Sequence, residues 1–474
     1  MLEQWKMLPL IPSANVENID FENILNASQE WMLSKEFNKK YIKTNHPYPP
    51  LLNPQLLKNE NSSIHYQNIP ADFAWQSNLP LPSGYKFLFL MMSHSGHASM
   101  VDYLKQCGVR IMKDHYGIIP KHYQFNYNAL LNNEPTIINF TSYSTMGYNY
   151  YEDLKKYIHL INPKTRVLCL VRDPIPRLKS SLNNHVGKDL TWQENLKYYF
   201  NEYENLNALE NRVVYSIDHK KSFKDRVEES LTITNTFRYS DIYEQMLALG
   251  FQQFDFLDIQ KITEAPDIFN LMEKLSKTYD FPAPKSEKDF DFPLDIRPFY
   301  GFLPLLYEVK GVKFLLTTSR KRERNVIFDL PWVEKILYQY HNADFLLSPN
   351  VENIEVSKIL NLDLSWFEQF KSGIYIYTAK ENLKNIEENQ EWIKQKINNF
   401  IQKLKDVMAI EKNRATTEFE LLEFFKTHPR HRQLFKKVIQ KEIELVKTHR
   451  PDIVQTWHYY LEFEKLCQQL DSKI

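Results

Sequence analysis

Two stretches of the chain carry polar side chains directly after an apolar run of strand length. Residues 86–92 lead into the turn Ser93-His94-Ser95-Gly96, and residues 166–171 lead into Arg172-Asp173-Pro174. Backbone N–H groups and hydroxyls at the start of a helix favour an anion such as phosphate. Arg172 adds a guanidinium that can form two hydrogen bonds to a phosphate, and Ser180 adds a hydroxyl on the following helix. Two anion sites at the strand ends of one sheet predict a nucleotide that is bound by both of its ends.

The predicted phosphate-binding loop comprises Ser93, Ser95, Gly96 and Ser99. His94 and His97 flank its glycine, and a histidine with an ordinary pKa of about 6.5 could take the proton of an acceptor hydroxyl. Other interpretations stay open: His94 could only donate to phosphate oxygens, a serine could simply cap the helix, and Arg172 could pair with Asp173. The loop is not a Walker loop, because no lysine follows the glycine.

Two further side chains are candidates for contacts with an acceptor, His115 and His122, which are expected on the loop between the first helix and the second strand. Tyr143 follows the second strand, and it would be a candidate base, with His115 and His122, if neither His94 nor His97 is the base. Asp289-Phe-Asp291 has the form of the metal-binding motif of many glycosyltransferases, but no apolar strand precedes it. No carboxylate-rich group accompanies His94 and His97, so we predict no metal.

These motifs resemble those of the sulfotransferase superfamily between about residues 85 and 284. The matching positions of the second motif are Arg172, Asp173, Pro174, Arg177 and Ser180. Residues 237–242 are similar to a third segment of that superfamily, and a helix is expected at 265–279. The resemblance implies that the loop holds the 5′-phosphosulfate side of the donor, while Arg172 and Ser180 hold its 3′-phosphate.

The chain also departs from the superfamily's pattern. His94 stands where the loop usually has lysine or arginine, and the catalytic histidine after the second strand is replaced by Thr141-Ser-Tyr-Ser144. The resemblance therefore implies phosphate binding more strongly than it implies the superfamily's catalytic chemistry. Over its whole length the chain resembles an uncharacterised family of epsilonproteobacterial proteins, some of which are labelled as sugar transferases.

The leading hypothesis is a transferase that moves a sulfuryl or similar charged group from a nucleotide donor to a hydroxyl. The acceptor would be a surface glycan, such as a capsule polysaccharide, or its lipid-linked precursor. The donor that the resemblance implies is phosphoadenosine phosphosulfate, and a cytidine diphosphate carrying a phosphoramidate is the alternative. A glycosyltransferase that uses a nucleotide sugar and a non-catalytic nucleotide-binding protein are the other hypotheses.

The composition of the chain limits the classes of partner and the location that we expect for it. The 474 residues include 59 Lys and Arg against 59 Asp and Glu, and this zero net charge argues against nucleic acid as a partner. No apolar run has the length of a transmembrane helix, so we expect a cytoplasmic protein. Residues 426–450 carry eight Lys and Arg against two Glu, an excess of 8 − 2 = +6. This stretch could contact the inner face of the membrane, or be a solvated helical face. Cys107 and Cys169 are expected to be reduced core residues.

The order of the expected elements defines the fold class. Strands at 86–92, 136–140 and 166–171 alternate with helices at 97–107, 151–161, 176–184 and 190–209. Apolar strands between helices predict an α/β fold, which is a parallel sheet with helices on both faces. In such sheets, ligands bind beyond the carboxyl ends of the strands. The first and third of these strands are expected to be parallel, with Gly96 and Arg172 at the same edge.

The remaining chain is expected to surround this nucleotide-binding core, which is assigned to residues 81–290. Residues 1–80 are predicted to be an irregular arm packed on the core, because proline and asparagine are frequent there. Residues 291–380 are predicted to be a cap or insertion with strands at 312–318 and 374–378. The basic cluster 317–324 follows the first of these strands and could contact donor phosphate or begin a solvated helix. Residues 381–474 are predicted to be helical, with a long amphipathic helix at 381–412 and breaks at Pro429 and Pro451.

Overall fold

The structure is a computed structural model that describes residues 21–91, 93–112, 119–141, 148–183, 199–212, 221–232, 237, 239–258, 264–290, 305–317, 352–370 and 374–471. The chain divides into two compact units. The first comprises residues 1–178, 228–291 and 425–474, and the second comprises residues 179–227 and 292–424. These boundaries differ from the predicted ranges, since residues 381–424 belong with the second unit and 425–474 with the first.

A four-stranded parallel sheet forms the centre of the first unit, in the order β2-β1-β3-β5. Its strands are β1 (Leu88–Met91), β2 (Ile138–Thr141), β3 (Val167–Val171) and β5 (Phe254–Asp258). Leu88 pairs with Ile138 on one side and with Val167 on the other. The predicted α/β class and the parallel pairing of β1 with β3 are confirmed. The sequence analysis missed β5, which pairs with β3 at the edge and whose apolar residues are interrupted by Asp255 and Asp258.

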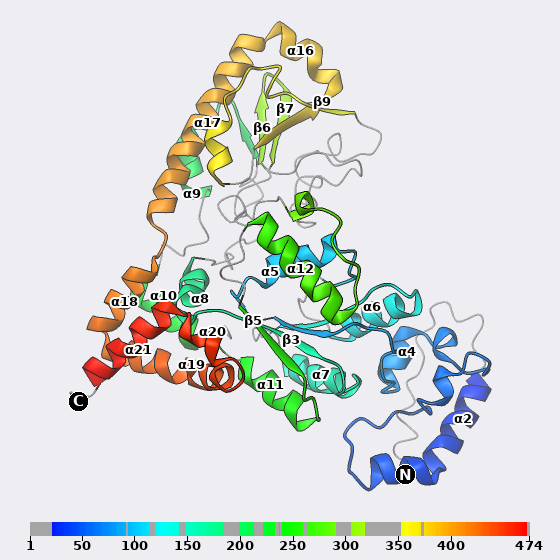
Figure 1. Ribbon diagram of the computed structural model, residues 1–474. Coiled ribbons are helices and arrows are strands. Elements are labelled where there is room, and N and C mark those ends of the chain that lie inside the picture. The colour runs from blue at the N-terminus through cyan, green and yellow to red at the C-terminus, as the bar shows by residue number, and fades with distance from the viewer. Residues whose placement is uncertain are drawn as a thin grey trace. The chain divides into compact units, whose positions relative to one another are not determined.

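Helices lie on both sides of this sheet. They include α5 (His97–Gln106), α6 (Ile119–Leu131), α7 (Tyr148–His159), α8 (Pro174–Leu182), α11 (Tyr239–Ala248) and α12 (Ala265–Tyr279). In Figure 1, α5 and α12 lie above the strands and α7 and α11 below them. Every residue of β1 and β3 is buried, as expected for central parallel strands that helices cover on both faces.

The N-terminal segment of the first unit is helical rather than irregular. Among its described residues are α2 (Phe21–Leu33), α3 (Lys35–Phe37) and α4 (Ala71–Gln76). The prediction of an irregular arm is therefore wrong for these stretches: the prolines of the described segment lie outside the three helices, and α2 accommodates Asn23 and Asn26. α4 packs on α6 through the rings of Trp75 and Tyr123, whose centroids are 5.3 Å apart.

The C-terminal part of the chain is helical, as predicted. It contains α18 (Glu418–Thr427), α19 (Pro429–His449), α20 (Pro451–Gln455) and α21 (His458–Asp471). Pro429 and Pro451 each occupy the first turn of a helix, where the missing backbone N–H has no partner to lose. Cys467 on α21 is buried and unoxidised, like Cys107 and Cys169.

The second unit contains a five-stranded sheet in the order β4-β6-β7-β9-β8. Its strands are β4 (Tyr199–Asn201), β6 (Leu305–Val309), β7 (Val312–Thr317), β8 (Asn353–Glu355) and β9 (Tyr375–Ala379). β7 and β9 confirm the two predicted strands. The helix predicted at 190–209 is wrong over residues 199–201, which form β4 and pair in parallel with β6. A local apolar pattern cannot reveal a partner that lies about a hundred residues further along the chain.

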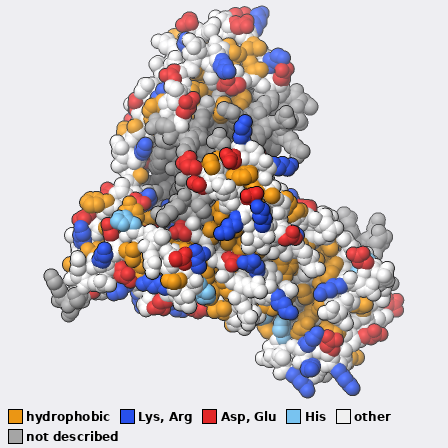
Figure 2. Space-filling view, in the orientation of Figure 1, with side chains coloured by type: hydrophobic (Ala, Val, Ile, Leu, Met, Phe, Trp, Pro, Cys, Tyr) orange, Lys and Arg blue, Asp and Glu red, His pale blue; other side chains and the backbone are white. Residues whose placement is uncertain are grey.

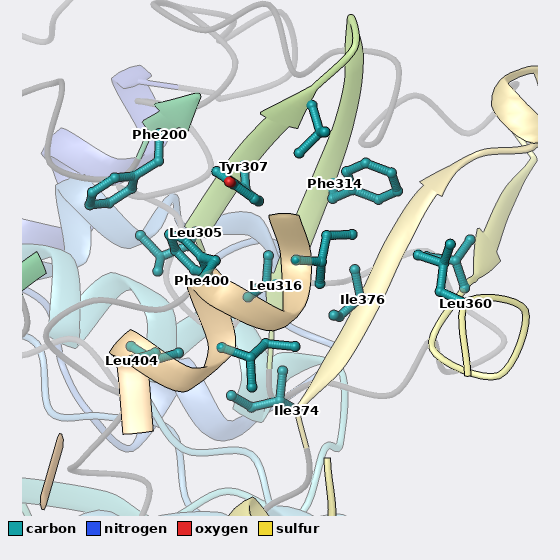
Figure 3. Close-up of a cluster of buried hydrophobic side chains, with 14 of the residues drawn as sticks. Phe200, Leu305, Tyr307, Phe314, Leu316, Leu360, Ile374, Ile376, Phe400 and Leu404 are labelled. Atoms are coloured by element: carbon teal, nitrogen blue, oxygen red, sulfur yellow. The ribbon is translucent and has the colours of Figure 1, made fainter. Parts of the chain in front are cut away.

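A long helix packs on this second sheet. Residues 381–412 fold as α16 (Leu383–Glu388) and α17 (Gln390–Asn413), with a break at Asn389. The predicted apolar face of α17 is buried, except that Trp392 is 43% exposed. Figure 3 shows buried side chains of the second sheet and of α17 directed toward one another. The rings of Tyr307 and Phe400 stack with their centroids 4.5 Å apart. None of the helices in the described ranges is long and apolar enough to cross a membrane.

Candidate anion-binding site at the ends of β1 and β3

The loop after β1 has a backbone that most residues avoid. Its φ angle is 62° at His94 and 89° at Gly96, which is the residue that precedes α5. Both values lie in the left-handed region, where glycine has no steric penalty and a residue with a side chain has one. The two left-handed residues turn the chain sharply from β1 into α5.

Two arginines hold successive carbonyls of this loop. Arg177 Nε donates to the carbonyl of Ser93 at 3.0 Å, and Arg172 Nη1 donates to the carbonyl of His94 at 2.9 Å. The C=O and N–H of a trans peptide point in opposite directions. The N–H groups of His94 and Ser95 are therefore directed away from the guanidinium that binds the same peptide. Both predicted motifs thus meet at one edge of the sheet, as the strand order requires.

The predicted binding residues differ in exposure. Ser93 and Ser95 are 4% and 0% exposed, so their hydroxyls lie inside the protein. His94, Gly96, His97, Ser99 and Arg172 are half-buried. Ser99 shares a side-chain hydrogen bond with Tyr103, one turn later on α5. Ser180 lies on α8 and is 4% exposed. Of the predicted binding residues, the half-buried ones are those that solvent partly reaches.

Asp173, next to Arg172, caps two helices. Its Oδ1 accepts the N–H of Ile175 in α8 at 3.0 Å. Its Oδ2 accepts the N–H groups of Tyr459 and Tyr460, in the first turn of α21, at 3.0 and 3.2 Å. Burial raises the pKa of Asp173 to about 6, although these hydrogen bonds oppose the rise. Beyond its place in the motif, the sequence analysis considered Asp173 only as an ion-pair partner of Arg172 and did not predict its role as a cap.

Arg177 is the second residue whose role sequence analysis missed. Its side chain is fully buried and forms a short ion pair with Glu442 on α19. Its guanidinium lies 4.8 Å from the ring centroid of Phe237. Glu442 is also buried, and this burial raises the pKa of Glu442 against the opposing effect of the Arg177 charge. The only sequence signal was the superfamily-like register of Arg177.

The C-terminal helices make further contacts with the sheet. Trp457, before α21, donates its indole N–H to Asp258 at the end of β5, at 2.7 Å. Arg450, at the end of α19, donates to the carbonyl of Phe256 within β5 at 3.0 Å. Together with Asp173, these contacts attach the segment 450–460 to β5 and to the carboxyl end of β3. Through Asp173, this segment contacts the residue next to Arg172 in the candidate site.

The other candidates lie elsewhere. His122 belongs to α6 and not to a loop, and its Nε2 contacts Asn139 Oδ1 at 3.1 Å within the core. Burial lowers the pKa of His122 to about 4. Asp289 accepts the N–H of Ser286 at 3.1 Å in a short turn. His115, Tyr143, Asp291 and the cluster 318–324 lie outside the described residues. Within the described ranges, no group of His, Cys, Asp and Glu is placed to hold a metal.

The basic stretch 426–450 is largely paired. Six of its eight cations form ion pairs with carboxylates in the first unit: Arg430, Arg432, Lys436, Lys441, Lys447 and Arg450. On the face that Figure 2 shows, acidic and basic side chains are interspersed. The local charge excess of the sequence is therefore offset by neighbours in the fold.

One family model matches the chain, over residues 256–470, and its description is "Protein of unknown function (DUF2972)". The match includes Glu442, Trp457 and all of α21 except Asp471, but not the loop after β1 or Arg172. No curated protein and no solved structure matches the chain significantly. The chain is thus similar, over slightly less than half its length, to a family whose function is not described.

Proposed function

We propose that the chain is a transferase that moves a sulfuryl or similar charged group from a nucleotide donor to a hydroxyl of a surface glycan or its precursor. The proposal is supported chiefly by the 2.9 Å contact between Arg172 Nη1 and the carbonyl of His94. This contact brings a half-buried cation to the loop that precedes the N-terminus of α5. A cation near a helix N-terminus favours a ligand with negative charge.

The reaction would be an in-line displacement. The oxygen of the acceptor hydroxyl forms a bond to the sulfur of the charged group, while the bond from that sulfur to the donor's phosphate oxygen breaks. The electron pair leaves with the nucleotide, and the hydroxyl proton passes to a base. His94 and His97 are the candidate bases, because both are half-buried around Gly96. The N–H groups at the start of α5 would stabilise the charge on the leaving phosphate, while Arg172 would bind the far phosphate of the donor, which does not react.

A titration of the full chain tests the proposal. Adenosine 3′,5′-bisphosphate, UDP and CMP are each added in a calorimeter, and the thermal unfolding of the chain is followed in parallel. We expect micromolar binding of the bisphosphate, and ligand at 100 times its dissociation constant should stabilise the fold by about 2.7 kcal/mol. Turnover of a UDP- or CMP-sugar, without binding of the bisphosphate, would instead show that the chain is a glycosyltransferase.

A further inference from the structure

A buried charge pair connects the loop after β1 to helix α19. Arg177 is 0% exposed and Glu442 is 3% exposed, and they are 265 positions apart in the sequence. One guanidinium makes both contacts: its Nη1 binds Glu442, and its Nε binds the carbonyl of Ser93 at 3.0 Å. The position of the loop is thus linked to a helix from the C-terminal part of the chain.

Stability alone gives little reason for such a pair. Removing two charges from water is costly, and replacing a buried ion pair by apolar side chains of similar volume is often neutral or stabilising. The guanidinium has a different property: its donors form a rigid fork, so fixing one arm fixes the direction of the others. Glu442 binds one arm of Arg177, and the direction of Nε toward Ser93 follows.

The contact at Ser93 orients a peptide that the candidate site needs. With its carbonyl bound to Arg177, the peptide between Ser93 and His94 directs its N–H the other way. Arg172 orients the next peptide in the same manner. Because His94 adopts a left-handed backbone, which is strained for a residue with a side chain, the loop has alternatives of lower strain to which it can relax when it is released.

We propose that Arg177 and Glu442 are positioning residues for the loop, so that helix α19 is required for tight binding of the nucleotide. This inference rests on the proposed function for its ligand. Glu442 acts only through Arg177, and Arg177 acts through the backbone of Ser93. The C-terminal helices then belong to the binding machinery and are not an independent appendage.

The test separates loop position from stability by exchanging the whole pair. In the double variant Arg177→Met, Glu442→Leu, no buried charge is left alone, so the fold should be retained. The matched control is Arg432→Met, Asp471→Leu, which removes another ion pair of α19 whose arginine is also buried. Binding of adenosine 3′,5′-bisphosphate is measured by calorimetry, and hydrogen exchange of the amides of residues 93–97 is measured without ligand.

We expect the Arg177, Glu442 variant to unfold near the wild-type temperature but to bind the bisphosphate about tenfold or more weakly, as for a lost charge-assisted hydrogen bond. Its loop amides should exchange faster, and the control should change neither property. Wild-type affinity and exchange in the folded variant would overturn the inference.

Two outcomes need a second measurement. If the wild type binds no nucleotide, the proposed function fails, but hydrogen exchange of the loop still decides whether the pair positions it. If the double variant does not fold, Arg177→Lys replaces it. A lysine keeps the charge opposite Glu442 but cannot present the fixed fork that also binds Ser93. Unchanged loop exchange in Arg177→Lys would then overturn the inference.

Discussion

Asp173 Oδ2 accepts a hydrogen bond from the backbone N–H of Tyr459 at 3.0 Å and thereby ties the end of β3 to the start of α21. The carboxylate is 1% exposed. Its burial raises the pKa of Asp173 to about 6, above the ordinary value of 3.8. The helix N–H groups favour the ionised form, but the loss of hydration outweighs them.

This pKa predicts a pH dependence of stability. A carboxyl group with a raised pKa binds its proton more tightly in the folded state than in the unfolded state. Its contribution to stability is therefore full below about pH 4 and is lost as the pH rises through about 6. Between pH 7 and pH 5 the free energy of unfolding should gain on the order of 1 kcal/mol from Asp173.

Urea unfolding of the wild type and of Asp173→Asn at both pH values measures this gain, because asparagine does not titrate. The difference between the two proteins should move in favour of the wild type as the pH falls. Asp452→Asn is the control, because the Arg450 guanidinium lowers the pKa of Asp452. The difference in free energy of unfolding between the wild type and Asp452→Asn should therefore not move in favour of the wild type as the pH falls. A constant difference for Asp173→Asn would show that its pKa is not raised.

The left-handed backbone at Gly96 makes a second prediction. Gly96→Ala should lower the free energy of unfolding by about 1 kcal/mol and also weaken nucleotide binding, because the loop must relax to accommodate the methyl group. Gly108→Ala is the matched control, since Gly108 has a φ of 74° with nothing within 4 Å of the added carbon. Both variants should lose stability, measured by urea unfolding, but only Gly96→Ala should lose affinity in calorimetry.

The candidate bases can be separated from binding residues by turnover. His97→Ala should lower turnover by about a hundredfold to ten-thousandfold if His97 is the base, and leave donor affinity nearly intact. For His94, asparagine is the better replacement, because it tolerates the left-handed backbone that His94 adopts. His159→Ala, on α7, is the control. Full turnover in both variants would show that neither histidine is the general base, and Tyr143 or His115 would then be the next candidate.

The sequence was sufficient to predict the elements whose signal is local. The apolar runs of β1 and β3 predicted buried parallel strands, and the polar turns after them predicted that Gly96 and Arg172 share an edge. Helix α12 was predicted with its observed bounds, Ala265–Tyr279. In each case the pattern and the structure depend on neighbouring residues, so no distant partner had to be known.

Features that depend on distant partners were missed. Glu442 lies in a basic, amphipathic stretch where a charge is normally solvated, and only the fold brings Arg177 to it. The capping role of Asp173 needed knowledge that α21 begins beside it. Strand β5 was missed because its acidic residues break the apolar pattern, and these acids bind Arg166 and Trp457.

The proposed two-motif nucleotide site is tested most directly by the affinity of adenosine 3′,5′-bisphosphate for Arg172→Ala. The control is Arg166→Ala. Arg166 precedes β3, so it lies at the end of the strand opposite to Arg172, and it pairs with Asp255. We predict that calorimetry will show a rise of about ten- to a hundredfold in the dissociation constant for Arg172→Ala, the loss of one charge-assisted contact, and little change for Arg166→Ala. Equal affinities of the wild type and Arg172→Ala would contradict the account.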